Sequence, residues 1–163
     1  MLKPLQLHTT RLRLRPATAL DCESMQPLWP EAELPRWRGN APGAGGAGLW
    51  VIALADGALD IGCVGLRPST MAPLLHEGSD EPFEPLLLLH GEHRGQGYAQ
   101  EAMRAVLWHA QSATRGRCFV AVCDVPNTAG DRLLRRLGFV PGYEADGGSW
   151  RVRQYRLPSM VTP

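Results

Sequence analysis

The residues with the most specific chemical pattern lie in the stretch LHGEHRGQGYAQEA, residues 89–102. Two glycines, Gly95 and Gly97, stand there between a run of leucines and an amphipathic segment. A glycine-rich turn that leads from a strand into a helix directs the helix's first free N–H groups at whatever lies beyond the turn, which favours a phosphate ligand. A tight turn without any ligand would use the same two glycines. Both interpretations stay open on the local pattern alone.

Two nucleotide-binding motifs can be tested against the same letters. A P-loop needs a lysine directly after its last glycine, and Lys3 is the single lysine of the chain. A dinucleotide fingerprint needs a third glycine where Gln100 stands, and it needs a βαβ unit, whereas the residues before the loop predict an antiparallel hairpin. A nucleotide-dependent enzyme is therefore the interpretation that the sequence disfavours.

The residues before the loop predict mostly strands. Leucines alternate with polar residues over 5–15, which predicts a strand that has one solvent-exposed face and ends at Pro16. Asp21 precedes a short apolar segment that predicts a helix ending before Pro30. Residues 30–48, rich in Pro, Gly and Ala, predict a long loop. The runs LWVIAL and DIGCVGLRP around an Asp-Gly turn predict an antiparallel pair.

The residues around and after the loop predict alternating strands and helices. Leu86–Leu89 reads as a central strand buried on both faces. The apolar stripe of the following helix, which should end near Gly116, comprises Ala99, Met103, Val106, Leu107 and Ala110. CFVAVCDV reads as another strand, and NTAGDRLLRRLG as a helix capped by Asn127 and stopped by Gly138, with Leu133, Leu134 and Leu137 as its core face. Residues 139–143 and 150–157 close the chain as strands.

The element order predicts the fold class. It indicates one α+β (mixed α/β) domain over residues 1–163, with a central, twisted, mostly antiparallel sheet of about seven strands flanked by helices. The chain has 163 residues and a formal net charge of +1, which argues against nucleic acid as the main partner. No apolar run has the length of a signal peptide or a membrane span, so we expect a cytoplasmic protein without a membrane partner.

The four cysteines, Cys22, Cys63, Cys118 and Cys123, form no C-x-x-C pair and have no histidine at ligand spacing. We expect no metal site and read these cysteines as small buried hydrophobic residues in a reducing compartment.

In its order and spacing of motifs, the sequence resembles the GNAT superfamily of N-acetyltransferases. The match lies in Arg94, Gly95, Gln96, Gly97, Tyr98 and Ala99 after the leucine strand, followed by Glu101 and Ala102. It continues in CDVPNTAGDRLLRRLGFV, with Asn127, Gly138 and Phe139. Upstream, HTTRLRLRPATALDCESM resembles the branch that includes the ribosomal-protein alanine acetyltransferases. The resemblance covers nearly the whole chain and is weakest over residues 30–48 and 70–82.

The resemblance implies a binding site for acetyl-CoA, with the sheet splayed beside it. The backbone N–H groups of residues 94–99 would hold the pyrophosphate, and Leu89 and His90 would lie along the pantetheine arm and supply an oxyanion donor. Asn127 would bind the pantetheine as well, although the same residue would serve equally well as a plain helix N-cap. The second substrate would be a primary amine, either a protein α-amino terminus or a small molecule, and a homodimer is left open.

Direct transfer requires an amine without its proton, and Glu84 is the candidate base implied by the resemblance. Glu84 could equally be a solvated carboxylate at a strand end. The weaker candidates are His76, Glu81, His90 and Glu92. The acceptor groove would be shaped by the region after the first helix, which carries Trp29, Arg36, Trp37 and Arg38.

Two positions depart from the family pattern. Leu134 stands where many members carry a tyrosine that protonates the departing thiolate, and Gly130 stands where the resembled branch often has a serine. A catalytically weak or silent domain that binds acyl-CoA is therefore the alternative to an active acetyltransferase.

Overall fold

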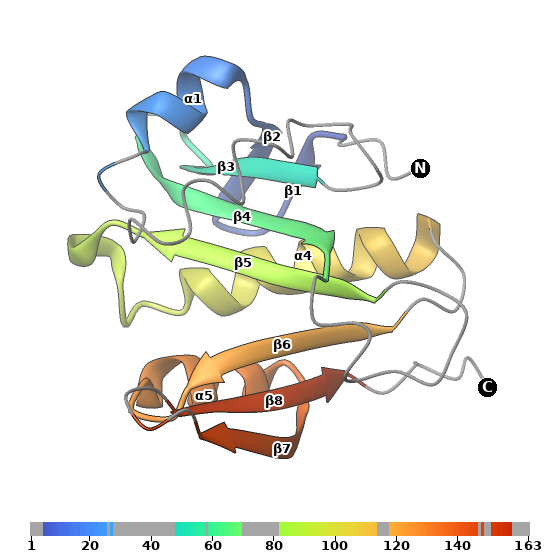
Figure 1. The fold of residues 1–163 in the computed structure, drawn as a ribbon. Coiled ribbons are helices and arrows are strands. Elements are labelled where there is room, and N and C mark those ends of the chain that lie inside the picture. The colour runs from blue at the N-terminus through green and yellow to red at the C-terminus, as the bar shows by residue number, and fades with distance from the viewer. Residues whose placement is uncertain are drawn as a thin grey trace. The chain divides into compact units, whose positions relative to one another are not determined.

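The computed structural model describes residues 5–25, 27, 48–57, 59–69, 82–113, 118–146, 148 and 151–157. Within this part, a mixed eight-stranded sheet has the strand order β1-β2-β3-β4-β5-β6-β8-β7 (Figure 1). The strands are β1 (Leu7–His8), β2 (Leu12–Pro16), β3 (Gly48–Leu54), β4 (Asp60–Pro68), β5 (Phe83–Leu89), β6 (Phe119–Asp124), β7 (Val140–Asp146) and β8 (Arg151–Leu157). The helices are α1 (Ala19–Ser24), α4 (Tyr98–Ala113) and α5 (Thr128–Arg136). The predicted α+β class is confirmed.

The described residues divide into two compact units. The first lies within Met1–Arg67 and Leu86–Arg115, and the second within Pro68–Pro85 and Gly116–Pro163. The bounds of a single domain, residues 1–163, stay a prediction, as does the splay of the sheet. Residues 30–47, most of the predicted long loop, lie outside the described residues.

The predicted strand over residues 5–15 is wrong in one respect, because a turn divides it. β1 pairs antiparallel with β2, with Leu7 opposite Leu14. The Thr9 N–H donates to the carbonyl oxygen of Leu12 at 2.9 Å, and the Thr9 hydroxyl oxygen accepts from the Leu12 N–H at 3.0 Å. Threonine often supplies such side-chain turns, so the leucine alternation continues through two short strands.

The first helix also differs from the prediction. α1 begins after Thr18, because Thr18 and Asp21 form a capping box, and it ends at Ser24. The Asp21 carboxylate accepts from the Thr18 N–H at 2.7 Å, and the Thr18 hydroxyl accepts from the Asp21 N–H at 3.3 Å. Asp21 is therefore the third helical residue and does not precede the helix.

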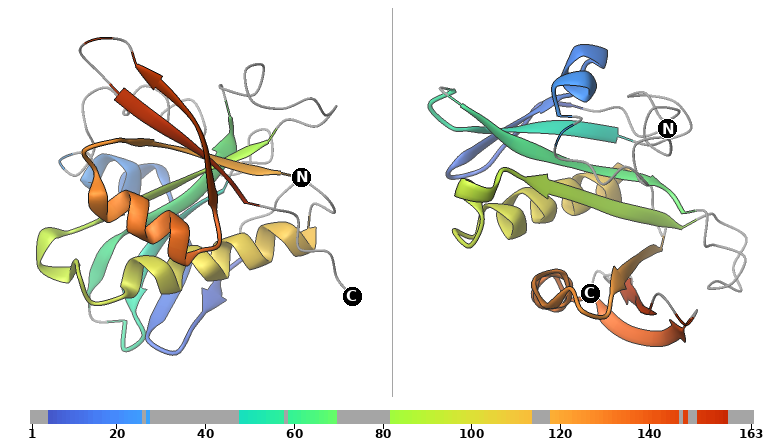
Figure 2. Two further views of the ribbon diagram at one scale, coloured as in Figure 1. Left: turned by 90° about the horizontal axis from the view of Figure 1, so that it is seen from below. Right: turned by 60° about the vertical axis from the view of Figure 1, so that its left-hand side comes forward.

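The sheet of the first unit is covered on both faces, with α1 and α4 on opposite sides (Figure 2). Leu49 and Val51 of β3 pack into a buried cluster with Met25, next to α1. The alternate residue, Trp50, meets His109 of α4 edge to face, with ring centroids 6.0 Å apart. β3 is consequently buried without a break from Gly48 to Ala53, and its predicted antiparallel pairing with β4 is confirmed.

β5 and α4 position the glycine loop. The leucine run is not buried on both faces as predicted, because only Phe83 and Leu89 of β5 are fully buried and the residues between them are half-buried. β5 is divided between the two units, with Phe83–Pro85 in the second and Leu86–Leu89 in the first. Its close approach to β4 requires Gly62, since a Cβ there would lie 2.1 Å from the Leu88 carbonyl oxygen.

α4 carries most of its predicted apolar stripe, except that Ala99 is half-buried and Ala102 is buried instead. The predicted end near Gly116 lies outside the described residues. The buried residues of α4 are Ala102, Met103, Val106, Leu107 and Ala110. Nowhere in the described ranges is a helix long and apolar enough to cross a membrane.

The second unit places α5 against the strands β6, β8 and β7. β6 pairs antiparallel with β8, β8 with β7, and β6 begins parallel to β5 at Phe119 and Phe83. Asn127 is the N-cap of α5, as predicted, and Gly138 ends it with a φ of +90°, a conformation that favours glycine. Leu134 is buried, whereas Leu133 and Leu137 are half-buried.

Candidate functional site

The glycine loop connects the end of β5 to the start of α4. A single turn of 3₁₀-helix (Gly91–His93) is followed by Gly95 and Gly97, whose φ angles are +74° and +83°. Residues with side chains rarely adopt these left-handed angles, so both positions need glycine for backbone reasons. In the part of the chain that the structure describes, no atom outside the adjacent residues lies within 4 Å of a Cβ built on Gly95. The turn is therefore open on the side where a ligand would approach.

The loop presents a continuous row of unused backbone donors. Among the described residues, none of the N–H groups from Gly95 to Gln100 donates to a protein acceptor, and the first helical bond runs from the Glu101 N–H to Gly97 at 3.1 Å. These donors belong to the turn and to the first residues of α4, where the helix dipole adds a partial positive charge. Free N–H groups in this arrangement can bind an anion such as a phosphate.

An ion pair between distant segments holds this loop. Arg11, in the turn before β2, donates from its Nη1 to the Gln96 carbonyl oxygen at 3.0 Å. Its Nε and Nη2 both reach Glu101 Oε2 at 2.7 Å. Its guanidinium carbon lies 4.6 Å from the centre of the Tyr98 ring. Sequence analysis missed Arg11, because no local pattern relates two residues about 90 positions apart.

At the end of β5, beside the loop, some backbone hydrogen-bonding groups are already used within the fold. The His90 N–H donates to the Ile61 carbonyl oxygen at 3.0 Å, so this donor is already used. The Leu89 carbonyl oxygen accepts from the Arg94 Nε at 3.0 Å. This bond ties the Arg94 side chain to the end of β5. Of the predicted residues, Leu89, His90 and Arg94–Ala99 thus lie along one segment that runs from the end of β5 through the loop to the first residues of α4. The oxyanion role at this strand end stays a prediction.

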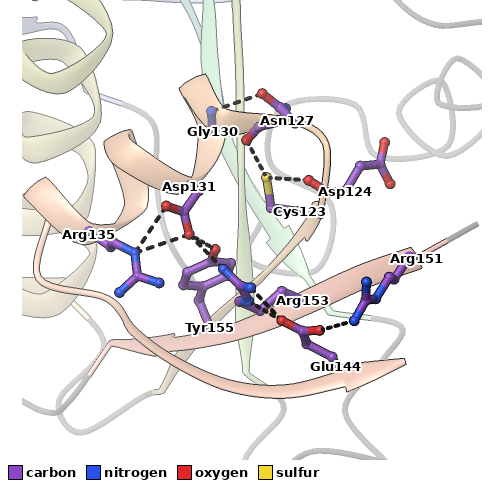
Figure 3. Close-up of polar contacts among 10 residues, drawn as sticks. All are labelled: Cys123, Asp124, Asn127, Gly130, Asp131, Arg135, Glu144, Arg151, Arg153 and Tyr155. Carbon is purple, nitrogen blue, oxygen red and sulfur yellow. Dashed lines mark hydrogen bonds and ion pairs between the residues drawn. The ribbon is translucent and has the colours of Figure 1, made fainter. Parts of the chain in front are cut away.

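Two further predicted residues, Glu84 and Asn127, belong to the second unit. Glu84 is the second residue of β5 and is half-buried. The candidates His76 and Glu81 lie outside the described residues, as do Trp29, Arg36, Trp37 and Arg38. Asn127 accepts at its side-chain oxygen from the Gly130 N–H at 2.9 Å (Figure 3), which confirms its role as a cap. Its role toward pantetheine stays a prediction.

The structure explains the glycine at position 130. A Cβ built there would lie 2.7 Å from Cys123 Sγ and 2.9 Å from Asn127 Nδ2. Figure 3 shows the Cys123 thiol below the first turn of α5, where it donates weakly to the backbone oxygens of Asp124 and Asn127 at 3.5 and 3.6 Å. Cys123 therefore fills the space that a residue-130 side chain would need. Burial raises the pKa of this thiol, and the Asp124 and Asp131 carboxylates raise it further.

A polar network ties α5 to β8 and β7 (Figure 3). The Tyr155 hydroxyl donates to Asp131, whose carboxylate also accepts from Arg135 and Arg153 at 3.1 Å. Arg153 continues the network to Glu144 of β7 at 2.6 Å. The hydrogen bond from Tyr155, followed by that from Arg135, lowers the pKa of Asp131, whereas burial and Asp131 raise the pKa of Tyr155. The Tyr155 hydroxyl is thus committed to a structural bond.

No group of three or more His, Cys, Asp or Glu residues in the described ranges is arranged to hold a metal ion.

Several solved structures share this fold. A protein described as a GnaT-family acetyltransferase from Bordetella pertussis is 22% identical, with a TM-score of 0.76 over 93% of this chain and 98% of that chain. A variant of spermidine N-acetyltransferase SpeG from Vibrio cholerae is 16% identical, with a TM-score of 0.69 over 91% and 94%. RimL, a ribosomal L7/L12 alpha-N-protein acetyltransferase solved with coenzyme A, is 18% identical, with a TM-score of 0.71 over 93% and 97%.

Comparison with curated protein sequences gives no match. These structural likenesses show that the chain shares the fold of these acetyltransferases. The family model of the acetyltransferase (GNAT) domain matches residues 11–140. The chain belongs to this family and is an N-acetyltransferase, as the resemblance of its glycine loop implied.

Proposed function

We propose that this protein transfers an acetyl group from acetyl-CoA directly to a primary amine, which is a protein α-amino terminus or a small molecule. The observation that carries the proposal is the row of unused N–H groups from Gly95 to Gln100 at the start of α4. RimL, a structural relative, was solved with coenzyme A. Acetyl-CoA carries a pyrophosphate, which matches such a row of donors.

The loop residues have distinct tasks in this proposal. The N–H groups of Gly95 and Gly97 approach the pyrophosphate, and at Gly95 no Cβ stands in the open space beside the turn. The exposed Arg94 adds a positive charge beside the same anion. Leu89 and His90 lie along the pantetheine arm in this proposal, and Asn127 is the further proposed pantetheine ligand, which keeps its cap on α5.

The choice of amine determines how much work the base has to do. A lysine side chain with a pKa near 10.4 costs roughly 4 to 5 kcal/mol to deprotonate at pH 7, whereas an α-amino group near 7.7 to 8 costs only about 1 kcal/mol. Glu84, half-buried in β5, is the proposed base that accepts this proton. A single carboxylate is sufficient to deprotonate an amine of low pKa, which favours an α-amino group or a similar amine as the acceptor.

No acid that could protonate the departing thiolate stands at the position where many family members carry a tyrosine. Leu134 is buried, with 8% of its surface exposed, and Gly130 has no hydroxyl. A thiol with a pKa near 8.5 leaves tolerably as its thiolate near neutral pH, so transfer does not require that acid. The same observation favours the second candidate function, a domain that binds acyl-CoA and turns it over slowly or not at all.

Ligand-dependent stability tests the binding half of the proposal. CoA and acetyl-CoA should raise the melting temperature, with about 2.7 kcal/mol of stabilisation at 100 times the dissociation constant. NAD and ATP, which lack the pantetheine arm, should raise it much less. Stabilisation by NAD or ATP without any by CoA would refute the proposal.

Thiol release from acetyl-CoA across a panel of amines tests the transfer half. Peptides with free α-amino groups and small primary amines should release CoA, and N-blocked peptides should not. CoA binding without release for any amine would favour the silent domain.

The variant Glu84→Gln tests the proposed base. It should lower the rate of acetyl transfer and steepen the rise of that rate with pH, because the amine must then lose its proton in solution. An unchanged pH profile for Glu84→Gln would remove Glu84 as the base. Glu23→Gln, at an exposed position of α1, is the control and should leave the profile unchanged.

A further inference from the structure

We propose that Arg11 is a positioning residue for coenzyme A. Its side-chain contacts, called the latch below, hold the glycine loop in the conformation that turns the free N–H groups outward. This inference rests on the proposed function, since it concerns the loop that would hold the pyrophosphate. Arg11 lies in the turn before β2, far from the loop in sequence, and half of the latch therefore comes from the N-terminal hairpin.

The contact with Gln96 fixes the orientation of a peptide group. Arg11 Nη1 donates to the Gln96 carbonyl oxygen at 3.0 Å. In a trans peptide the C=O and the following N–H point in opposite directions. Because the Gln96 oxygen points at Arg11, the Gly97 N–H points away from it, toward the open side of the turn. At Gly97, a Cβ would already lie 3.3 Å from Arg11 Nη2, so the guanidinium lies close against the loop.

The other contacts anchor the guanidinium itself. Glu101 Oε2 accepts from both Nε and Nη2 of Arg11 at 2.7 Å. Glu101 Oε1 accepts from the Thr9 hydroxyl at 2.6 Å and from the Arg11 N–H at 2.9 Å. Each guanidinium nitrogen thus has a protein acceptor, which uses three of the five N–H groups of Arg11 and ties the side chain to the loop.

The pair also removes a charge conflict at the start of α4. Glu101 lies in the first turn of the helix, close to where the anion would bind. An unpaired carboxylate there would repel a pyrophosphate. Burial opposes the ionisation of Glu101, yet the bonds from Thr9 and Arg11 outweigh it and lower its pKa. The carboxylate stays charged, and Arg11 neutralises it locally.

A preformed loop spares the ligand the cost of ordering it. When only a fraction of molecules has the binding conformation, the apparent dissociation constant rises by the inverse of that fraction. Loss of the latch should therefore weaken every ligand that carries the pyrophosphate by the same factor. It should leave the chemistry at the acetyl group unchanged once the ligand is bound.

The test measures the dissociation constants of CoA and of its nucleotide half, 3′-phosphoadenosine 5′-diphosphate, by calorimetry. Arg11→Ala should weaken both by about ten-fold, given the usual strength of charge-assisted hydrogen bonds. Arg11→Lys should behave like Arg11→Ala, because one ammonium cannot contact both Gln96 and Glu101. At saturating acetyl-CoA the transfer rate should match that of the wild type.

The matched control is Arg15→Gln, which removes an ion pair of Arg15 with Asp21 and Asp60 in the same unit, away from the loop. It should leave both dissociation constants unchanged although it lowers stability.

Each outcome has one meaning. Equal weakening of both ligands in the two Arg11 variants supports the latch. Full rescue by Arg11→Lys would overturn it in favour of charge steering, and weakening of CoA alone would place the effect at the pantetheine. If the wild type binds CoA and Arg11→Ala binds it equally well, only this inference fails. If the wild type binds no CoA, the proposed function itself fails.

Discussion

Gly95 and Gly97 show how one residue type can meet two requirements. Their φ angles of +74° and +83° require glycine even in the free protein. The space beside Gly95, where no atom lies within 4 Å of a Cβ, suits a ligand in addition. The tight-turn and phosphate interpretations of the sequence are therefore compatible, and a suitable pair of variants separates their energies.

Gly95→Ala should cost about 1 kcal/mol of stability, because an L-residue is strained at this φ. It should also raise the KM for acetyl-CoA by more than this loss of stability can explain, because the new methyl group occupies the space through which the pyrophosphate approaches. Gly148→Ala is the matched control, since Gly148 has a φ of +84° and equally open surroundings outside the loop. A rise in KM of similar size in both variants would assign the Gly95 effect to general destabilisation. Urea unfolding and initial-rate kinetics supply the two readouts.

Gly130 meets a different requirement, which is packing against Cys123. Gly130→Ala should destabilise the protein by about 1–3 kcal/mol, because the added Cβ would lie 2.7 Å from the thiol sulfur. Cys123→Ala should restore part of this loss in the double variant, giving a non-additive cycle. Gly142→Ala is the control, with its nearest neighbour at 3.9 Å, and should be close to neutral. Additive losses in chemical denaturation would contradict the proposed contact.

At the scale of elements, α1 owes its first turn to a capping box whose aspartate also forms an ion pair. Asp21 accepts from Thr18 and from both terminal nitrogens of Arg15, the latter at 2.8 Å. The hydrogen bond from Arg15 is the main cause that holds the pKa of Asp21 well below its usual value. A six-residue helix without a buried residue depends strongly on such contacts.

This predicts an acid-sensitive contribution to stability. Because the folded pKa of Asp21 is lowered, its contribution is complete above the unfolded pKa of about 3.9 and is lost as the pH falls toward the folded value. Asp21→Asn should cost about 1 kcal/mol at pH 7 and should flatten the decline of stability in acid. Glu23→Gln, exposed on the same helix, should change neither. Parallel acid curves for the wild type and Asp21→Asn would contradict the assignment.

At the scale of the whole molecule, stability depends on packing and hydrogen bonds without covalent links. All four cysteines are free, and three of them are buried. Burial raises the pKa of the Cys63 thiol to about 12, so this thiol is protonated and unreactive near neutral pH.

The melting temperature should therefore be the same with and without a reductant. An Ellman titration of the folded protein should be slow, and four thiols should react after unfolding in guanidinium chloride. A drop in melting temperature on reduction, or fewer than four thiols after unfolding, would show a disulfide that the structure does not have.

Much of this protein follows from local sequence. The β3–β4 hairpin, the apolar stripe of α4, the Asn127 cap and the Gly138 stop are each specified by residues within a few positions of one another. Local hydrogen bonds and side-chain periodicity determine such elements, and the glycine loop belongs with them. The division of the first strand and the start of α1 were also local, but they depended on side-chain bonds of Thr9 and Asp21 that compete with the apolar pattern.

Only the tertiary structure decided what holds the loop and why position 130 is a glycine. Arg11 reaches Gln96 and Glu101 across about 85 to 90 positions. Cys123 is close to Gly130 in sequence, at the end of the preceding strand β6, but the way α5 packs on that strand brings the two together. The partner of a charged side chain or the space beside a Cα depends on which segments the fold brings together. The sequence by itself therefore determined the local elements and the family, and the packing of distant segments decided how the site is held in shape.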